Sequence, residues 1–426
     1  MPISCRKGFC MISNLILGIG AAATLSIPNG CWLGSVILAV RGLLHREGFR
    51  SLLRDADDFR WFLFACLGYA AVNGLLLAYH GEPASSYEYL IPFLIAPLLL
   101  NGLRGRALNP NYLFAGFAFA ALVAGGLAID QVLIRGTHIR AVGHIKAIPF
   151  GNLSIVGGTV SLMGLLYVPK ALPLHMRLLF ALGALSGLIA SLLSGSKGGW
   201  LAVLVVGPIV FYLLLRVLDK KVTLIILLLL VLSAGFAIFC PGSPVLRRLQ
   251  QTVDSVRQGT LEGRRRDGSL APRLAVWRYV IEDALWRSPI VGSSRSELAK
   301  EQKRVAEEKS APRMRRALDH YHNELLDTLA TKGLVGVGVL ALLFLSAFRF
   351  FIRRIRCDSP EQRVLGWLGT IVLLEFAVFS LTDIQFQISA VRSMFMFVVI
   401  SVASLILAEE QRRLASSSSG APTDAA

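Results

Sequence analysis

Apolar segments of about 20 residues recur along this chain, and an α-helix of that length crosses the hydrocarbon core of a bilayer. Backbone polar groups in lipid must be paired within their own segment, so these segments are expected to be helices. The composition agrees, because 54% of the residues are hydrophobic and the mean hydropathy is +0.60. The sequence therefore predicts an all-α integral membrane protein.

We count twelve such segments, which predicts about twelve transmembrane helices. The second is short, and the first is too long and too poorly flanked by a cleavage site to be a removable signal peptide. The segments are 9–27, 31–44, 61–79, 87–103, 112–133, 148–168, 176–193, 198–215, 222–240, 331–352, 364–382 and 390–408.

The basic residues of the short loops predict the orientation, because Lys and Arg are enriched in cytoplasmic loops. With the N-terminus inside, the inner loops and ends hold eighteen of them, and the short outer loops hold four: Arg135, Arg140, Lys146 and Lys197. An even number of helices then places both termini in the cytoplasm.

One connection is long. Residues 241–321, between the ninth and tenth segments, hold seventeen Lys/Arg and ten Asp/Glu, a net charge of +7. Long loops do not count toward the charge rule, so they leave the orientation unchanged. Apolar residues recur at helical spacing in "RLAVWRYVIEDALW", and Ser294 with Glu297 has the spacing of a capping box. The loop is expected to be a cationic helical structure on the outer face.

These features divide the chain into four parts. They are 1–240 with helices one to nine, 241–321 as the outer helical loop, 322–408 with helices ten to twelve, and 409–426 as a flexible cytoplasmic tail.

Several classes of function are disfavoured. The six cysteines are scattered without metal-like spacing, and we find no P-loop, dinucleotide fingerprint or nucleic-acid module. The net charge of +17 divides between the inner loops and the outer loop. Phosphate-bearing membrane lipids are therefore better partners than nucleic acid.

The stretch "DHYHNELLDTLATKGLVG", Asp319 to Gly336, puts a polar cluster directly before the tenth apolar segment. On a helix Asp319 and His322 share a face, so the carboxylate is placed to orient the imidazole. His320 and His322 would point in opposite directions, which argues against a shared zinc ion. The alternative is an interfacial polar belt without chemistry.

Three cations are predicted on the same side of the membrane as His322. Arg140 precedes the sixth helix, Lys197 lies in the glycine-rich turn "SGSKGGW" between helices seven and eight, and Arg273 belongs to the outer loop. Each alone is consistent with an anchor for lipid headgroups. Together they would form a cationic pocket that suits a diphosphate attached to a lipid, because charge-assisted contacts to phosphate oxygens are strong.

These residues carry a resemblance to the bacterial O-antigen ligase family, which shares its domain with O-antigen polymerases and protein O-oligosaccharyltransferases. His322-Asn323, nine residues and then Gly333-Leu334-Val335-Gly336 resemble the family's H-[NSQ]-x9-G-x-x-G motif. "SGSKGGWLA" is similar to its S-G-S-R-G-G-W-L segment, with Lys197 where arginine is usual. Val337 departs from the residues that the longer motif prefers.

A third stretch completes the resemblance. "PRLAVWRYVIEDALWRSPIVG" resembles the family's R-x-x-x-W…P-x-x-G pattern, through Arg273, Trp277, Pro289 and Gly292. The expected layout of twelve helices with a large outer loop after the ninth also agrees, so the resemblance covers nearly the whole chain. It implies a membrane glycosyltransferase fold of the GT-C-like kind.

The resemblance further implies transfer of O-antigen from undecaprenyl diphosphate to lipid A–core oligosaccharide, at the periplasmic face of the inner membrane. Arg140, Lys197 and Arg273 would bind the diphosphate, and His322 would activate or position the acceptor hydroxyl. Asp319, Asn323, Gly333 and Gly336 would support them. The reaction would be inverting and would need no nucleotide, cofactor or metal.

Two other classes of function stay open. An O-antigen polymerase or protein O-oligosaccharyltransferase would use the same donor with another acceptor. A transporter of lipid-linked glycans or anions would need ionisable groups deep within helices, and Glu375 is the main candidate, without an evident partner at matching depth.

Overall fold

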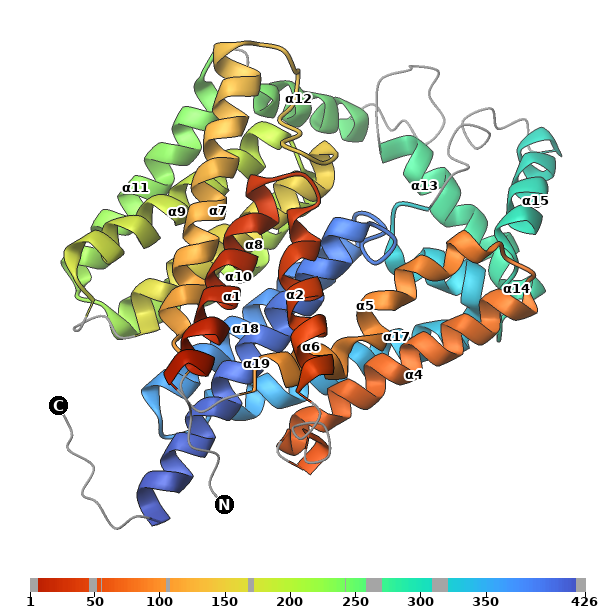
Figure 1. The fold of residues 1–426 in the computed structure, drawn as a ribbon. Coiled ribbons are helices and arrows are strands. Elements are labelled where there is room, and N and C mark those ends of the chain that lie inside the picture. Colours follow the sequence, from red (N-terminus) through yellow and green to blue (C-terminus); the bar gives the residue numbers. More distant parts are fainter. Residues whose placement is uncertain are drawn as a thin grey trace.

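The computed structural model describes residues 7–45, 52–54, 56–104, 108–167, 172–241, 243–257, 270–308 and 321–418. These residues contain helices and no strand, and the long helices form one bundle (Figure 1). The predicted all-α class is confirmed.

The long helices carry the apolar segments. They are α1 (Lys7–Ser26), α2 (Gly30–Leu44), α4 (Arg60–Tyr79), α7 (Pro110–Ile129), α8 (Ala147–Tyr167), α9 (Leu174–Ser194), α10 (Lys197–Val217), α11 (Lys220–Phe239), α17 (Glu324–Ile355), α18 (Pro360–Ser380) and α19 (Ser389–Ser418). The shorter elements are η1 (Asp57–Phe59), η2 (Ala84–Leu90), α5 (Ile91–Leu94), α6 (Ala96–Gly102), η3 (Asp130–Ile134), α12 (Pro244–Arg257), α13 (Leu270–Tyr279), η4 (Val280–Ala284), α14 (Leu285–Arg287) and α15 (Arg295–Glu308).

Within the described parts of the chain, nine helices are long and apolar enough to cross a membrane, and α1 and α2 supply shorter apolar helices. The expectation of one continuous helix over 87–103 is wrong, because this segment is divided into η2, α5 and α6. Pro92 and Pro97 each lie in the first turn of a new short helix. Proline lacks the N–H that would continue the preceding helix, which explains the division. The count of twelve spanning helices stays a prediction.

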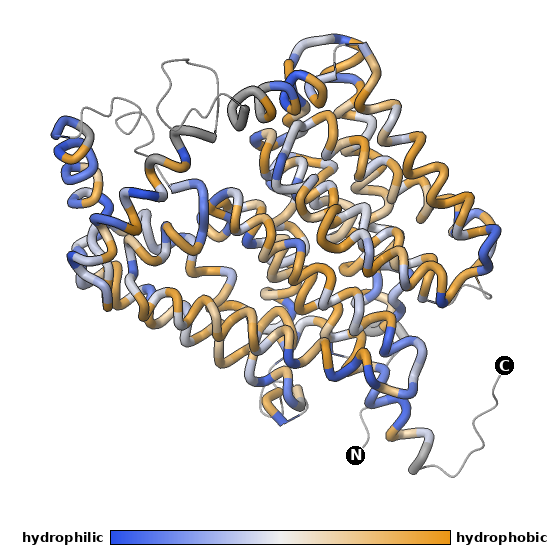
Figure 2. Tube along the Cα trace, turned by 180° about the vertical axis from the view of Figure 1, so that it is seen from behind, coloured by the Kyte–Doolittle hydropathy of each residue, from blue (hydrophilic) through white to orange (hydrophobic). Residues whose placement is uncertain are grey.

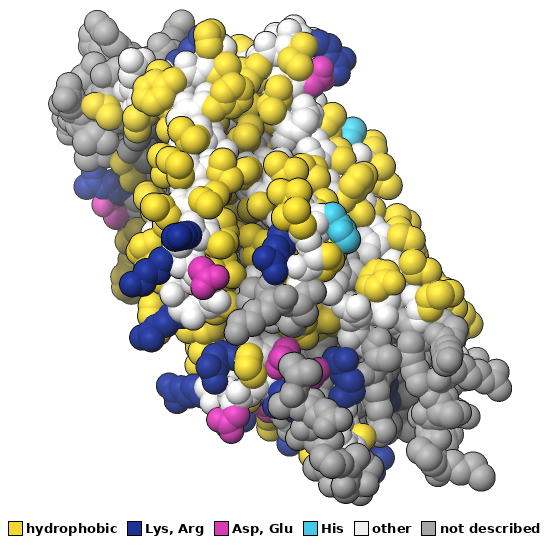
Figure 3. Space-filling view, turned by 90° about the vertical axis from the view of Figure 1, so that its left-hand side faces the viewer, with side chains coloured by type: hydrophobic (Ala, Val, Ile, Leu, Met, Phe, Trp, Pro, Cys, Tyr) yellow, Lys and Arg dark blue, Asp and Glu magenta, His cyan; other side chains and the backbone are white. Residues whose placement is uncertain are grey.

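The bundle has a buried centre and an apolar outer surface. Helices α8 and α19 are almost completely enclosed by other helices, whereas α11 lies at the edge and exposes Leu224, Val231 and Leu232. Hydrophobic residues run along the outer helices (Figure 2), and they cover much of one lateral face (Figure 3). A surface this apolar suits contact with lipid chains.

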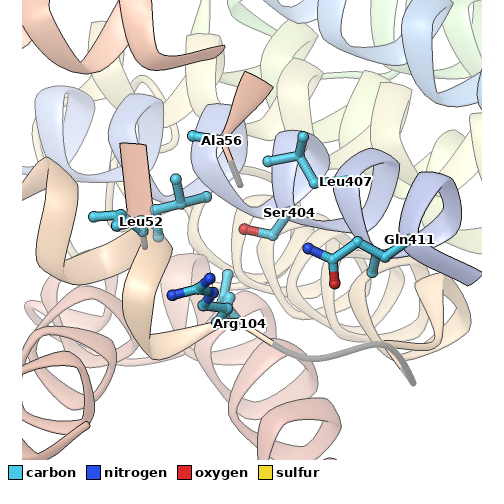
Figure 4. A pocket seen from close by; sticks show the side chains of 9 residues that line it. Leu52, Ala56, Arg104, Ser404, Leu407 and Gln411 are labelled. Carbon is cyan, nitrogen blue, oxygen red and sulfur yellow. The ribbon is translucent and has the colours of Figure 1, made fainter. Parts of the chain in front are cut away.

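At one end of the bundle, ion pairs join helices to each other. The Arg354 guanidinium contacts Asp58 and lies 3.2 Å from Glu410. A cavity of about 30 Å³ at this end is lined by residues that include Leu52, Arg104 and Gln411 (Figure 4). It has room for about two water molecules. This is the end predicted to face the cytoplasm.

The opposite end, which we call the site end, carries the segments predicted to face outward. The α1–α2 turn, the η3–α8 loop, the α9–α10 turn, the start of α17 and the α18–α19 loop all lie there. The helices of the long loop, α12, α13 and α15, lie along this side of the bundle (Figure 1). The predicted capping box is confirmed, because Ser294 Oγ accepts from the Glu297 N–H at 3.2 Å and Glu297 accepts from the Ser294 N–H at 3.1 Å.

Candidate functional site

His322 lies just before the first turn of α17. Asn323 is the N-cap of that helix, and its Oδ1 accepts from the Leu326 N–H at 3.1 Å. Asn323 Nδ2 also donates to the Leu381 carbonyl at 3.3 Å, which fixes the start of α17 against the end of α18. His322 itself has φ of +49°, a backbone conformation that few residues other than glycine adopt.

The imidazole of His322 contacts a carboxylate that the sequence did not single out. His322 Nδ1 lies 3.2 Å from Asp383 Oδ1, in the loop between α18 and α19. A carboxylate only accepts hydrogen bonds, so Nδ1–H donates to it and the neutral ring presents Nε2 as the acceptor. The Asp383 side chain is 7% exposed and that of His322 30% exposed. The pair thus has a buried carboxylate behind a reachable imidazole.

The predicted pairing of His322 with Asp319 rested on both being helical. His322 is not helical, because its φ is positive and α17 begins at Glu324. Asp319 and His320 lie outside the described residues. The signal that sequence analysis missed is the acidic Asp383 at the outer end of an apolar segment, on the side of the membrane already predicted for His322.

The backbone of α17 crosses the segment at Pro289 and Ile290 in close contact. Gly333 interrupts the helix with φ of +61° and ψ of −160°, a combination that is essentially confined to glycine. At this break the Leu334 N–H donates to the Pro289 carbonyl at 2.8 Å. A Cβ on Gly333 would lie 2.3 Å from the Ile290 carbonyl carbon, and a Cβ on Gly292 would lie 2.3 Å from the backbone nitrogen of Lys332. The G-x-x-G and P-x-x-G motifs therefore contact each other.

Gly336 has a local role one turn further along α17. A Cβ at this position would lie 2.3 Å from Lys332 Cβ and 3.1 Å from Thr328 Cγ2. The missing side chain leaves room for the buried Lys332, whose Nζ lies 4.6 Å from the centre of the Tyr89 ring.

A second group of residues forms around the α9–α10 turn. Arg140 Nε donates to the Ser194 carbonyl at 2.7 Å, and both Arg140 and Arg248 donate to the Gly195 carbonyl at 3.4 Å. Gly195 has φ of +64° and ends α9. The Gly195 carbonyl thus holds two guanidinium groups side by side. Arg248, on α12, was not predicted.

Lys197 and Arg273 belong to the same group. The charges of Arg248, Arg273 and Arg140 act on the Lys197 ammonium. We call Arg140, Lys197, Arg248 and Arg273 the cation cluster. It unites the three predicted diphosphate ligands with one further arginine.

The positive charges of the cluster act on one another. Burial, followed by the charges of Arg248 and Arg273, lowers the pKa of Arg140 to about 10. Burial and the charge of Arg273 likewise lower the pKa of Arg248. These guanidinium groups remain charged at neutral pH, so the cluster is a concentrated positive charge that a polyanion would relieve.

Two observations link the cation cluster with the His322–Asp383 pair. Burial lowers the pKa of Arg273, while the negative charge of Asp383 acts in the opposite direction, so the two charges lie within electrostatic range of each other. A Cβ on Gly198 would lie 2.4 Å from Thr382 Oγ1, which places the turn after Lys197 against the residue before Asp383. The structure thus brings Arg140, Lys197, Arg273 and His322 to one site.

The described residues include no group of three or more His, Cys, Asp or Glu side chains arranged to hold a metal ion. Metal independence stays a prediction.

Comparison with known proteins agrees with the motifs. Residues 180–341 match the family model described as O-antigen ligase, a segment that contains Lys197, Arg248, Arg273 and His322. The chain is also similar to an uncharacterized protein of Haemophilus influenzae, with 21% identity over 366 residues, which cover 86% of this chain and 91% of that protein. The family match confirms the predicted resemblance. Members of that family are glycosyltransferase-like enzymes that act on lipid-linked glycans.

Proposed function

We propose that this protein is an O-antigen ligase, which transfers O-antigen polysaccharide from undecaprenyl diphosphate to lipid A–core oligosaccharide. The site end would face the periplasm of a bacterial cell inner membrane, with both termini in the cytoplasm. The observation that carries the proposal is the meeting of a cation cluster with a His–Asp pair at one end of a membrane bundle.

The cation cluster supplies what the donor needs. The bond that breaks joins the anomeric carbon of the sugar to a diphosphate oxygen, and negative charge develops on that oxygen. Arg140, Lys197, Arg248 and Arg273 would hold the diphosphate and stabilise this charge in a partly buried setting. The two guanidinium groups on the Gly195 carbonyl are already oriented, so little reorganisation accompanies binding.

The His322–Asp383 pair supplies what the acceptor needs. His322 Nε2 would accept the proton of the acceptor hydroxyl while its oxygen attacks the anomeric carbon, and the electron pair of the broken C–O bond would leave with the diphosphate. Asp383 would hold Nδ1–H and stabilise the imidazolium that forms. A single direct displacement inverts the anomeric centre. The sugar that is transferred is already activated by its link to the lipid diphosphate, so the chemistry requires no nucleotide.

Two related activities share this donor chemistry, namely O-antigen polymerase and protein O-oligosaccharyltransferase. An acceptor assay in proteoliposomes separates the three. Glycosylated lipid A–core supports the ligase, a lengthened lipid-linked glycan supports the polymerase, and a glycosylated protein supports the third. Product formed only on one of the latter two acceptors would overturn the ligase assignment.

The transporter alternative rests on Glu375, deep in α18. The Thr159 hydroxyl donates to Glu375 Oε1 at 2.5 Å, so its contact is a neutral hydroxyl on α8. This corrects the expectation that it lacks a partner at its depth. The same proteoliposomes test the alternative, because a transporter would move labelled lipid-linked glycan across the bilayer without any transfer product.

A further inference from the structure

A second cavity lies at the site end and takes no part in the arrangement described above. Its volume is about 380 Å³, and it lies between the α1–α2 turn, the loop before α8 and the loop before α19. Its polar and aromatic lining includes Asn29, Trp32, His144, Lys146, Gln387 and Ser389. We call this cavity the outer crevice.

Hydrogen bonds hold the walls of the outer crevice in place. Trp32 Nε1 donates to Ser389 Oγ, which ties α2 to the start of α19. The buried Arg392 donates to the Gln387 carbonyl at 2.9 Å, and its guanidinium carbon lies 5.9 Å from the centre of the Trp32 ring. The Trp32 ring and the backbone at Gln387 are thus pre-positioned, which reduces the entropy lost on binding a ligand.

The electrostatics of the outer crevice favour an anion. Three long helices begin beside it. Helix α2 begins at the lining residue Gly30, α19 begins at the lining residue Ser389, and α8 begins directly after the lining residue Lys146. Helix N-termini carry partial positive charge and unpaired N–H groups, which together bind phosphate. Lys146 adds a full charge from an exposed position, and the described residues that line the crevice include no carboxylate.

The chemistry of the lining is also that of a sugar site. An aromatic face packs against the apolar face of a sugar ring, while amides and hydroxyls bond its hydroxyl groups. The volume falls within the range of about 300–1,000 Å³ typical of small-molecule sites. Gln387 follows Asp383 by four residues, so their Cα atoms are at most about 14 Å apart. One oligosaccharide can therefore extend from this crevice to His322.

We propose that the outer crevice binds a phosphate-bearing oligosaccharide segment of the acceptor, with Lys146 contacting the phosphate and Trp32 packing on a sugar ring. This inference rests on the proposed function, since it assigns a binding region to the acceptor of that reaction. It gives the two substrates separate cationic regions. The cation cluster takes the donor diphosphate, and the crevice takes the acceptor phosphate.

The test uses the purified full-length protein in phosphatidylcholine nanodiscs. The acceptor is lipid A–core lipopolysaccharide without O-antigen, used intact or after removal of its phosphates. The variants are Lys146→Glu and Trp32→Leu, with Lys300→Glu and Trp286→Leu as matched exposed controls on the outer loop. We expect Lys146→Glu to raise the acceptor KM at least about tenfold, the effect of one charge-assisted contact. The donor Kd and the kcat should stay within about twofold.

Removing the acceptor phosphates separates the possible sources of the effect. For the wild-type protein, removal of the phosphates should raise the acceptor KM by the same factor as Lys146→Glu does with the intact acceptor. With the dephosphorylated acceptor, Lys146→Glu should raise the KM no further, because the two changes remove one and the same contact. Additive losses would overturn the proposal. A Lys146 effect that appears only when phosphatidylglycerol is present would assign the crevice to a phospholipid headgroup instead.

The proposal remains testable if transfer to lipid A–core is not observed. Direct binding of the intact lipopolysaccharide, measured without donor, should still be about tenfold weaker for Lys146→Glu than for wild type and Lys300→Glu. Absence of transfer with this difference present would contradict only the proposed function. Equal binding by all three proteins would contradict the crevice.

Discussion

Asp383 Oδ1 lies 3.2 Å from His322 Nδ1, although 61 positions separate the two residues in the chain. The contact joins the loop after α18 to the start of α17, and the Asn323 side chain holds the same two segments together through the Leu381 carbonyl. The imidazole is therefore oriented by a contact between two helix ends. Substitution of Asp383 can therefore test what this carboxylate contributes through the imidazole.

Asp383→Asn should lower kcat about 10²-fold or more with little change in stability. The amide keeps the shape but removes the charge that stabilises the imidazolium, and it can donate to Nδ1 and impose the wrong tautomer. The donor Kd should stay the same or fall, because Arg273 loses a nearby negative charge that competes with the diphosphate. Single-turnover transfer measured beside donor binding checks both effects. Asp130→Asn, whose partner is the exposed Arg135, is the matched control.

Arg248→Ala should weaken donor binding about tenfold, because one charge-assisted contact to the diphosphate would be lost. Its neighbour Arg247 is exposed on the same helix, so Arg247→Ala removes an equal charge outside the cluster. Titration of both variants with a lipid-linked diphosphate compares them directly. Equal weakening in both would show that long-range charge, and not a contact of Arg248, attracts the donor.

Gly195→Ala should disrupt the cation cluster. Its Cβ would lie 2.8 Å from Arg248 Cδ and 3.1 Å from Arg248 Nε, at a φ of +64°. Gly136→Ala is the control, because Gly136 has φ of +58° with nothing near its Cβ position. Both should bear a similar backbone strain of about 1–2 kcal/mol, measurable as a lower thermal midpoint. Only Gly195→Ala should also weaken donor binding, and equal binding in the two variants would contradict the arrangement of Arg248.

Those parts of the fold that depend on local composition could be predicted from the sequence. Hydropathy located the long helices, and the spacing of Ser294 and Glu297 predicted a helix start that the structure confirms. The expected continuous helix over 87–103 is absent, because Pro92 and Pro97 divide this apolar segment into short helices. The length of an apolar segment indicates that it can lie in lipid, but it does not indicate that the segment forms one continuous helix.

The candidate site was recovered only in part, for a related reason. Arg140, Lys197, Arg273 and His322 were identified because motifs and predicted topology placed them on one side. Arg248 and Asp383 have no motif of their own, and they join the site through the packing of α12 against α9 and of α18 against α17. Tertiary contacts of this kind do not appear in the sequence spacing.

Gly333→Ala should destabilise the protein strongly, and Gly338→Ala should not. A Cβ on Gly333 would lie 2.3 Å from the Ile290 carbonyl carbon, and its backbone angles are accessible essentially to glycine alone. Gly338 lies in the same helix with open space around its Cβ position, so alanine there should be neutral or favourable to the helix. Thermal unfolding in detergent compares the two. A similar midpoint for both variants would show that the crossing of the Pro289 and Gly333 segments carries little stability.

The division of roles between His322 and Arg273 is the sharpest test of the proposed mechanism. His322→Ala should preserve donor binding and reduce single-turnover transfer by about 10²–10⁴-fold, the usual contribution of a positioned acid–base group. Arg273→Ala should weaken donor binding and transfer together. Arg273→Lys should restore only part of the loss, because the planar fork is gone.

Lys197→Arg serves as the control for these variants, since it keeps the charge in the cluster and introduces the residue usual in the resembling family; it should be tolerated. Donor binding measured beside single-turnover transfer separates the two roles for each variant. If His322→Ala abolished donor binding while Arg273→Ala left it intact, the roles would be reversed. The imidazole held by Asp383 would then act on the diphosphate, and a different group would have to take the proton of the acceptor hydroxyl.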